Sequence, residues 1–131
     1  MISTNDNKAS GNRSVAEGIK TEASGKYSHT EGENTKASKI AAHAEGSSSD
    51  ASGNYSHAEG LMSYAMGQAS HAEGGTTQAK GDNSHAEGQS THAEGTASHT
   101  EGSSTYAFGK NSHAEGIQTQ IYTNCGHVQG Q

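Results

Sequence analysis

Small and polar residues recur along the chain with a strict period of seven, whereas large apolar residues are scattered. From Asn5 to Gly130 the sequence divides into 18 consecutive heptads of the form x-x-S/T-x-A-x-G, without insertion or deletion. The third position is Ser or Thr in 15 heptads, the fifth is Ala in 14 and the seventh is Gly in 16. Such regularity predicts a repeat architecture rather than an ordinary globular core.

The heptad favours a strand over a helix. One Gly per heptad would cost a helix about 1 kcal/mol each time, and a coiled coil needs apolar residues at two positions per heptad. In an extended chain, positions three, five and seven point to one side and positions four and six to the other. We therefore expect the small residues to face inward, and Gly at position seven to supply the positive φ of a tight corner.

Alternate heptads differ, so the true period is fourteen residues. One class reads S-H-A-E-G, whereas the other varies at positions four and six. Each fourteen-residue coil then has two short strands and two corners, and coils stack by backbone pairing at about 4.8 Å. The prediction is an all-β parallel β-solenoid (β-roll) in three parts. Residues 1–4 form an N-terminal tail, residues 5–116 form the repeats, and residues 117–131 form a degenerate repeat that caps the rod.

Composition and charge narrow the possible functions. Hydrophobic residues make up only 27% of the chain, which is typical of disorder, but repeated backbone pairing can supply order without a large core. The formal charge is −6 and no basic run exists, which argues against nucleic acid as a partner. No apolar stretch is long enough to insert into a membrane. The single Cys125 allows no intrachain disulfide.

The near-constant His/Glu pair of one heptad class predicts a subunit interface. A surface packed against identical neighbours meets the same environment in every coil, and a narrow roll with a small core gains stability by association. The residues predicted at this interface are His29, Glu31, His43, Glu45, His57, Glu59, His71, Glu73, His85, Glu87, His99, Glu101, His113 and Glu115.

Two kinds of chemistry fit these pairs. In the first, His and Glu hydrogen-bond across the interface and satisfy each other's buried polar groups. In the second, copies of His57, His71 and His85 around a threefold axis hold an ion: neutral imidazoles suit Zn, Ni or Cu, and protonated ones suit chloride. No dedicated cofactor is expected, only such an adventitious ion.

The sequence does not predict an enzyme. The Pro-Cys-x-x-Cys partner that His-x-Glu needs in zinc deaminases is missing, and so is His-Glu-x-x-His. No single copy of the repeat differs from the others in a way that would mark a catalytic site.

The paired S-x-A-x-G heptads resemble the YadA-like head repeat of trimeric autotransporter adhesins over about residues 5–130, and residues 14–18 (S-V-A-E-G) come closest. This resemblance implies a left-handed parallel β-roll, a homotrimer and a role in adhesion, at the cell surface or elsewhere outside the cell. The S-H-A-E-G variant is similar to repeats of phage and prophage tail and fibre proteins, which implies a virion. Where the adhesins tend to have Val and Ile, this chain has His and Glu.

Two functions follow from these observations. One is a non-enzymatic, adhesin-head-like surface or fibre segment that attaches to a host surface or an extracellular-matrix ligand. The alternative is a structural spacer of a phage tail fibre or cell-surface fibre, with no ligand of its own. Ice binding, a third class, is disfavoured because Thr occupies mainly the inward third position.

Overall fold

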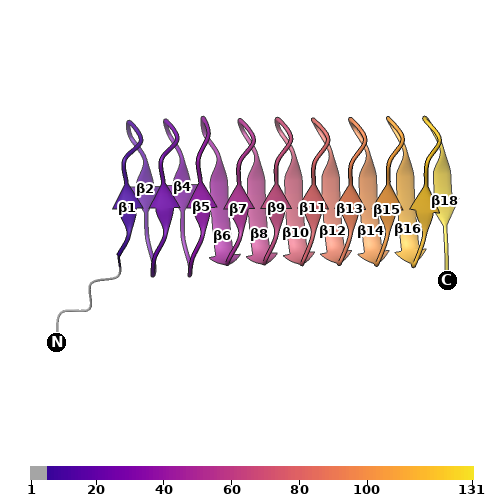
Figure 1. Cartoon of the computed structure of the whole chain (residues 1–131), viewed down its shortest axis with the longest axis horizontal. Coiled ribbons are helices and arrows are strands. Elements are labelled where there is room, and N and C mark those ends of the chain that lie inside the picture. Colours follow the sequence, from indigo (N-terminus) through magenta and orange to yellow (C-terminus); the bar gives the residue numbers. More distant parts are fainter. Residues whose placement is uncertain (1–5) are drawn as a thin grey trace.

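The chain forms one straight rod of stacked coils, as a computed structural model shows for residues 6–131 (Figure 1). Two nine-stranded parallel sheets make up the rod, and the described residues contain no helix. The all-β parallel solenoid predicted from the sequence is confirmed. The predicted tail, residues 1–4, lies outside the described residues.

The two heptad classes form separate sheets. We call the sheet built from the variable heptads the variable sheet; its strands are β1 (Lys8–Ala9), β3 (Glu22–Ala23), β5 (Lys36–Ala37), β7 (Asp50–Ala51), β9 (Tyr64–Ala65), β11 (Gln78–Ala79), β13 (His92–Ala93), β15 (Tyr106–Ala107) and β17 (Gln120–Ile121). The histidine sheet contains β2 (Val15–Ala16), β4 (His29–Thr30), β6 (His43–Ser47), β8 (His57–Leu61), β10 (His71–Gly75), β12 (His85–Gln89), β14 (His99–Ser103), β16 (His113–Ile117) and β18 (His127–Gln129). Each strand pairs with the residues fourteen positions along, as His71 does with His85, so the fourteen-residue coil is confirmed.

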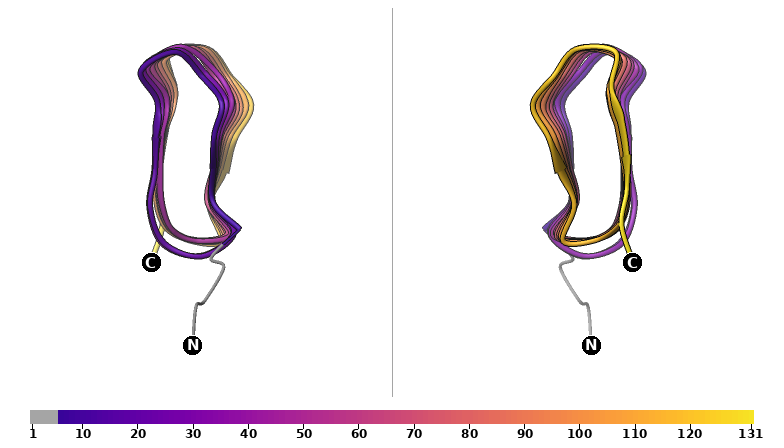
Figure 2. Two further views of the ribbon diagram at one scale, coloured as in Figure 1. Left: turned by 90° about the vertical axis from the view of Figure 1, so that its left-hand side faces the viewer. Right: turned by 90° about the vertical axis from the view of Figure 1, so that its right-hand side faces the viewer.

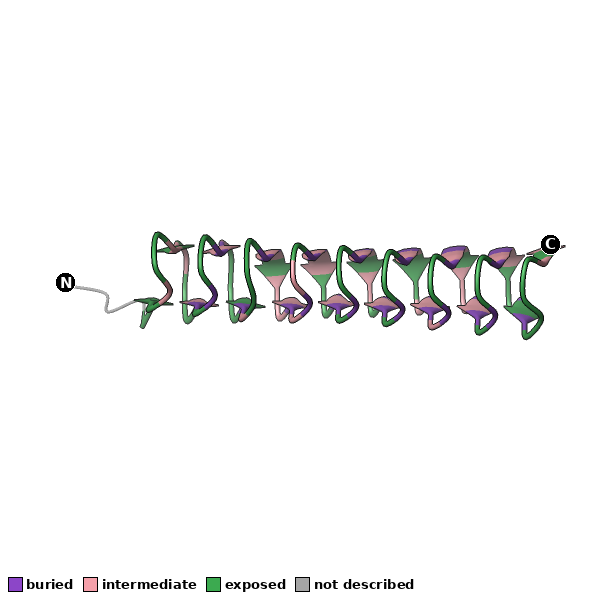
Figure 3. Ribbon diagram, turned by 90° about the horizontal axis from the view of Figure 1, so that it is seen from above, coloured by how far each residue is buried: buried purple, intermediate pink, exposed green. Residues whose placement is uncertain are grey.

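Positions three and five fill the interior with Ala, Ser and Thr. Ala58 and Ala72 are fully buried, and buried residues recur from coil to coil in both sheets (Figure 3). The inward serines of the histidine sheet also close a corner. The hydroxyl of Ser70 donates to the carbonyl of Gly67 at 2.7 Å, and most coils repeat this bond. These buried hydroxyls therefore keep the hydrogen bond that burial demands.

Viewed along the rod, the coils superimpose as a flattened oval (Figure 2). The wall that leads to the C-terminus, which is the histidine sheet, is the straighter of the two long walls. Because successive coils follow the same path, equivalent residues fall into straight rows along the rod.

The glycines at position seven serve two different purposes. On the histidine sheet all but the last, Gly130, have φ between 98° and 110°, for example Gly60 and Gly74, so the expected positive φ is confirmed there. After the variable strands, glycines such as Gly67 and Gly81 are buried and have no positive φ. A Cβ on Gly67 would lie 2.1 Å from the carbonyl oxygen of Gly81. These glycines are therefore required by the close approach of successive coils, not by their own φ.

The sharpest backbone conformation of each corner lies at position two, which the sequence did not single out. All eighteen residues at this position are non-glycine and have φ between 50° and 60°. Fifteen of them also continue a hydrogen-bonded row, since the amide donates to the carbonyl of position one in the preceding coil, as Tyr55 does to Ile40. The stacked corners hold these left-handed residues in place.

Exchanging two such corner residues should change stability in opposite directions. A left-handed φ is most unfavourable for a β-branched residue and least so for Asn. We expect Thr76→Asn (φ 58° at Thr76) to raise the free energy of unfolding by roughly 0.5–1 kcal/mol. Asn83→Thr (φ 57° at Asn83) should lower it by a similar amount. Urea unfolding followed by circular dichroism measures both, and shifts of equal sign would contradict the explanation.

Residues 117–131 continue the solenoid as its ninth coil. Strands β17 and β18 stay in register with β15 and β16. Ile121 is buried and Val128 packs beside it, whereas Tyr122 is exposed. A capping role for this coil remains a prediction.

Candidate functional site

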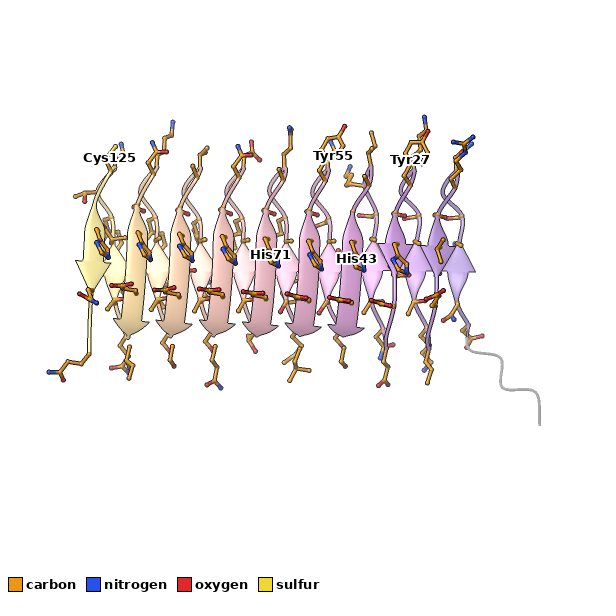
Figure 4. All side chains as sticks on the ribbon, turned by 180° about the vertical axis from the view of Figure 1, so that it is seen from behind. Tyr27, His43, Tyr55, His71 and Cys125 are labelled. Carbon is orange, nitrogen blue, oxygen red and sulfur yellow. The ribbon has the colours of Figure 1, made fainter. Side chains whose placement is uncertain are left out.

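Eight histidines form one continuous stack along the outside of the histidine sheet, and Figure 4 shows them as a row. Their ring centroids are 4.6–4.9 Å apart and their planes differ by 2–9°. The register causes this arrangement, because it places each position-four side chain directly beside its equivalent in the next coil. The members are His29, His43, His57, His71, His85, His99, His113 and His127.

A parallel row of carboxylates lies beside the rings, two residues along each strand (Figure 4). Most of these carboxylates span two histidines: Glu73 Oε2 lies 3.7 Å from His71 Nε2, and Glu73 Oε1 lies 3.6 Å from His85 Nε2. The carboxylates that do so are Glu45, Glu59, Glu73, Glu87 and Glu115. We call the two rows together the His–Glu ladder. Five rings have two carboxylates within 4.0 Å of Nε2, namely His43, His57, His71, His85 and His113.

The Nε2 atoms of the ladder are buried although the rings are not. The side chains of His57 and His71 are 35% exposed, yet their Nε2 atoms are buried without a hydrogen-bond partner, as are five others in the row. Separations of 3.4–4.0 Å from the carboxylate oxygens exceed the usual 2.7–3.2 Å of a hydrogen bond. Each Nε2 therefore faces one or two carboxylates without bonding to either.

Burial favours the neutral form of four ladder histidines. It lowers the pKa of His43, His85, His99 and His113 below the ordinary 6.5, and repulsion from neighbouring rings lowers it further. The nearby carboxylates oppose this shift without reversing it. On the variable sheet, burial raises the pKa of Asp50, and Lys36 counteracts that effect.

An open groove of about 1220 Å³ follows the carboxylate row along the rod. Its lining repeats the Glu-Gly pair of successive coils from Glu31–Gly32 onward and ends at Gln129–Gly130. The groove therefore presents a line of carboxylates at the spacing of the coils, and no lining coil before the last differs from its neighbours.

The ninth histidine lies outside the ladder. His92 belongs to the variable sheet, where it stacks on Tyr106 at 4.7 Å. The neighbouring Glu94 is held by Lys80, with Nζ and Oε1 2.9 Å apart. Residues 91–95 read T-H-A-E-G, much like the ladder heptads. In the preceding coil, however, Lys80 occupies the position that Glu has in the ladder, so His92 lacks a carboxylate from that coil.

An aromatic cluster extends this stack toward the C-terminal end of the variable sheet. Phe108 lies 6.1 Å from Tyr106 and 4.8 Å from Tyr122 between ring centroids. The ring of Tyr122 is exposed. This cluster is the main apolar feature that distinguishes one end of the variable sheet from the other.

All fourteen residues predicted at a subunit interface lie on one face, in the two rows of the ladder. The structure also gives a reason within one chain for their repetition, because each ring stacks on identical rings and most carboxylates span two of them. This reason was not predicted from the sequence, although the fourteen-residue spacing of the pairs contained it. The subunit interface and the threefold arrangement of His57, His71 and His85 remain predictions.

The chain matches no protein-family model and no curated protein. Among the described residues, none forms a helix that is long and apolar enough to cross a membrane.

Proposed function

We propose that the chain is a non-enzymatic, rigid segment of a surface or fibre protein, which forms a parallel homotrimer through its histidine sheet and mediates attachment to a host or matrix surface. A left-handed winding of the coils and a location at the cell surface, outside the cell or on a virion belong to this proposal. The observation that carries it is the straight face on which the same His/Glu pair repeats coil after coil.

A periodic face is best matched by a partner of the same period. Equivalent residues follow one another at the coil spacing along the histidine sheet, as the ring separations of 4.6–4.9 Å show. A second copy aligned in parallel would meet each coil in the same way. The interior offers little apolar area, since apart from Ile121 its buried hydrophobic side chains are all Ala, so association adds stability that the core lacks.

The variable sheet supports the attachment part of the proposal. It points away from the histidine sheet and carries side chains that differ from coil to coil, including the aromatic cluster around Phe108 and Tyr122. Exposed aromatic side chains are common in protein contacts. The spacer alternative is favoured by the uniformity of the ladder, in which no coil stands out as a binding site.

The molar mass in solution tests the association. We expect light scattering in the presence of a chelator to give about 40 kDa, three times the 13.4 kDa of the chain. Glu73→Lys should shift the mass toward the monomer, because it places three cations in the interface. Glu33→Lys is the matched control, since it makes the same charge change at an exposed corner. Circular dichroism verifies that both variants fold, and a monomeric parent chain would refute the proposal.

Binding of the trimer to immobilised matrix proteins or to cells then tests whether the chain attaches to a ligand or serves only as a structural spacer. We expect saturable binding that is weakened by Phe108→Ser and Tyr122→Ser, which replace aromatics by the residue found at the same position in coils such as that of Ser52. A trimer that binds none of these surfaces would leave the spacer alternative.

A further inference from the structure

The spacing between the ladder nitrogens and carboxylates matches the edge of a metal coordination shell. Zinc binds imidazole nitrogen and carboxylate oxygen at about 2.0–2.2 Å, so two ligands of a tetrahedral ion lie roughly 3.3–3.5 Å apart. His57 Nε2 lies 3.5 Å from Glu45 Oε1 and 3.9 Å from Glu59 Oε2. His71 Nε2 lies 3.5 Å and 3.7 Å from its two carboxylate oxygens. These distances are too long for hydrogen bonds and need only small closures for coordination.

The orientation of the rings decides how the ligands are shared. Because neighbouring imidazoles are stacked and nearly parallel, their Nε2 lone pairs point in the same direction and cannot converge on one ion. Five carboxylates, by contrast, direct one oxygen to each of two successive rings, as Glu59 does to His57 and His71. The natural ligand set is therefore one imidazole with one oxygen from each of two carboxylates.

We propose that the His–Glu ladder binds a row of Zn²⁺-type divalent cations, each held by one His Nε2 and two Glu carboxylates of the same chain, with water completing the shell. A close group of one His and two Glu, with ligand atoms within 4.8 Å of one another, is formed by Glu17, His29 and Glu31. The buried Nε2 atoms without hydrogen-bond partners are the free donors, and the carboxylate row supplies the negative charge. Mixed imidazole and carboxylate ligands suit Zn²⁺ better than Mg²⁺ or Ca²⁺.

The same geometry limits how many sites fill at once. Adjacent sites share a carboxylate and lie one coil apart, so two divalent ions in neighbouring coils repel each other strongly. We therefore expect alternate coils to be occupied. Of the five rings with two carboxylates, four are consecutive (His43, His57, His71 and His85) and His113 stands apart, which gives two to three ions per chain.

Titration of the metal-free full chain with Zn²⁺ alone tests this proposal. Calorimetry should give two to three ions per chain, and Co²⁺ in place of Zn²⁺ should show the visible absorption of a tetrahedral ion. A variant with the five rings His43, His57, His71, His85 and His113 changed to Gln should lose this binding, with affinity at least tenfold weaker. His92→Gln is the matched control and should bind as the parent does, because His92 has no second carboxylate.

A second variant keeps the test decisive if the fivefold change prevents folding. Glu73→Gln removes one carboxylate from the sites of both His71 and His85 and should reduce the measured stoichiometry by about one ion. A parent chain that takes up no Zn²⁺, or unaltered binding by folded ladder variants, would overturn the proposal.

This inference does not depend on the homotrimer. All ligands of a site come from one chain, so a monomer that binds Zn²⁺ would refute the trimer and leave the metal row intact. A trimer that takes up no Zn²⁺ would refute the metal row and leave the homotrimer intact.

Discussion

Gly67→Ala is expected to destabilise the rod by roughly 3 kcal/mol or more, because the added methyl group has no space that it could occupy. Its Cβ would lie 2.1 Å from the carbonyl oxygen of Gly81 in the next coil. That carbonyl belongs to the backbone of a hydrogen-bonded coil, in which the amide of Gly81 donates to Ala93 and its carbonyl accepts from Ser84. The coil cannot retreat without breaking the row of bonds that stacks it. Thermal unfolding followed by circular dichroism measures the loss.

Gly75→Ala is the matched control. Gly75 is the last residue of β10, its φ is not positive, and a Cβ there would meet nothing within 4 Å. The change should be neutral or stabilise slightly, since Ala reduces the freedom of the unfolded chain. Equal unfolding temperatures for the Gly67 and Gly75 variants would show that the close approach of the coils is not what requires glycine.

Because each coil contacts only its neighbours, the Gly67 variant should also unfold in two parts. Contacts in a solenoid run from one repeat to the next, so a fault at Gly67 weakens the junction between the coils before and after it. The coils on either side keep their own neighbours. A broadened or biphasic transition is therefore the expected shape, and Gly75→Ala should retain the single transition of the parent.

Much of the fold could be predicted from the sequence because the repeat leaves few alternatives. The inward Ala and Ser/Thr positions and the fourteen-residue register follow from alternation and period alone. The left-handed corner at position two could not be predicted, since residues as different as Arg13, Ala41 and Thr76 occupy it. Stacking of one corner on the next fixes that conformation, and local preference contributes little.

The exceptions to the repeat occur in pairs, and the structure gives a reason for one of these pairs. Position seven is not Gly at Lys39 and Thr123, and three residues later the usual Ser is also replaced, by Ala42 and Gly126. In the C-terminal corner, a Cβ on Gly126 would lie 2.5 Å from Ile121 Cδ1 and 2.7 Å from Thr123 Oγ1. The larger side chains of Ile121 and Thr123 therefore take the space of the corner serine in this coil.

The position of the ladder could be predicted from the sequence, but the contacts within it could not. The spacing of His and Glu places both on one outward face, but it does not show that most carboxylates contact two rings, because that depends on the rotamers and on the register of neighbouring coils. His92 illustrates the limit. Residues 92–95 have the same sequence as in the ladder, yet the neighbours Lys80 and Tyr106 give His92 a different environment.

Acidification is expected to destabilise the metal-free rod between pH 7.5 and pH 5. The pKa of His43, His85, His99 and His113 is lower in the folded chain than the ordinary 6.5, chiefly because of burial. Above pH 6.5 these rings are neutral in both the folded and unfolded states, and their contribution to stability is fully present. As the pH falls below 6.5, the unfolded chain binds protons that the folded chain does not, so the free energy of unfolding decreases.

Several rings titrate within one stack, so their effects should combine into a fall of several degrees in the unfolding temperature. Each protonated ring would face its stacked neighbours as well as its two carboxylates, and the carboxylates offset only part of the cost. Asp50 acts in the opposite direction, because its pKa is raised, but it is a single group on the other sheet. Circular-dichroism melts at pH 7.5 and pH 5.0 in the presence of a chelator measure the net change.

Changing the four ladder histidines with a lowered pKa to Gln separates this cause from general acid effects. Glutamine does not titrate and stacks well in parallel strands, where its amide can bond to the next coil. The fourfold variant should therefore lose most of the difference in unfolding temperature between the two pH values, and what is left comes in part from His92, whose pKa burial also lowers. A parent chain that is equally or more stable at pH 5.0 would mean that ion pairing with the carboxylates outweighs burial, and that the ladder is charged rather than neutral.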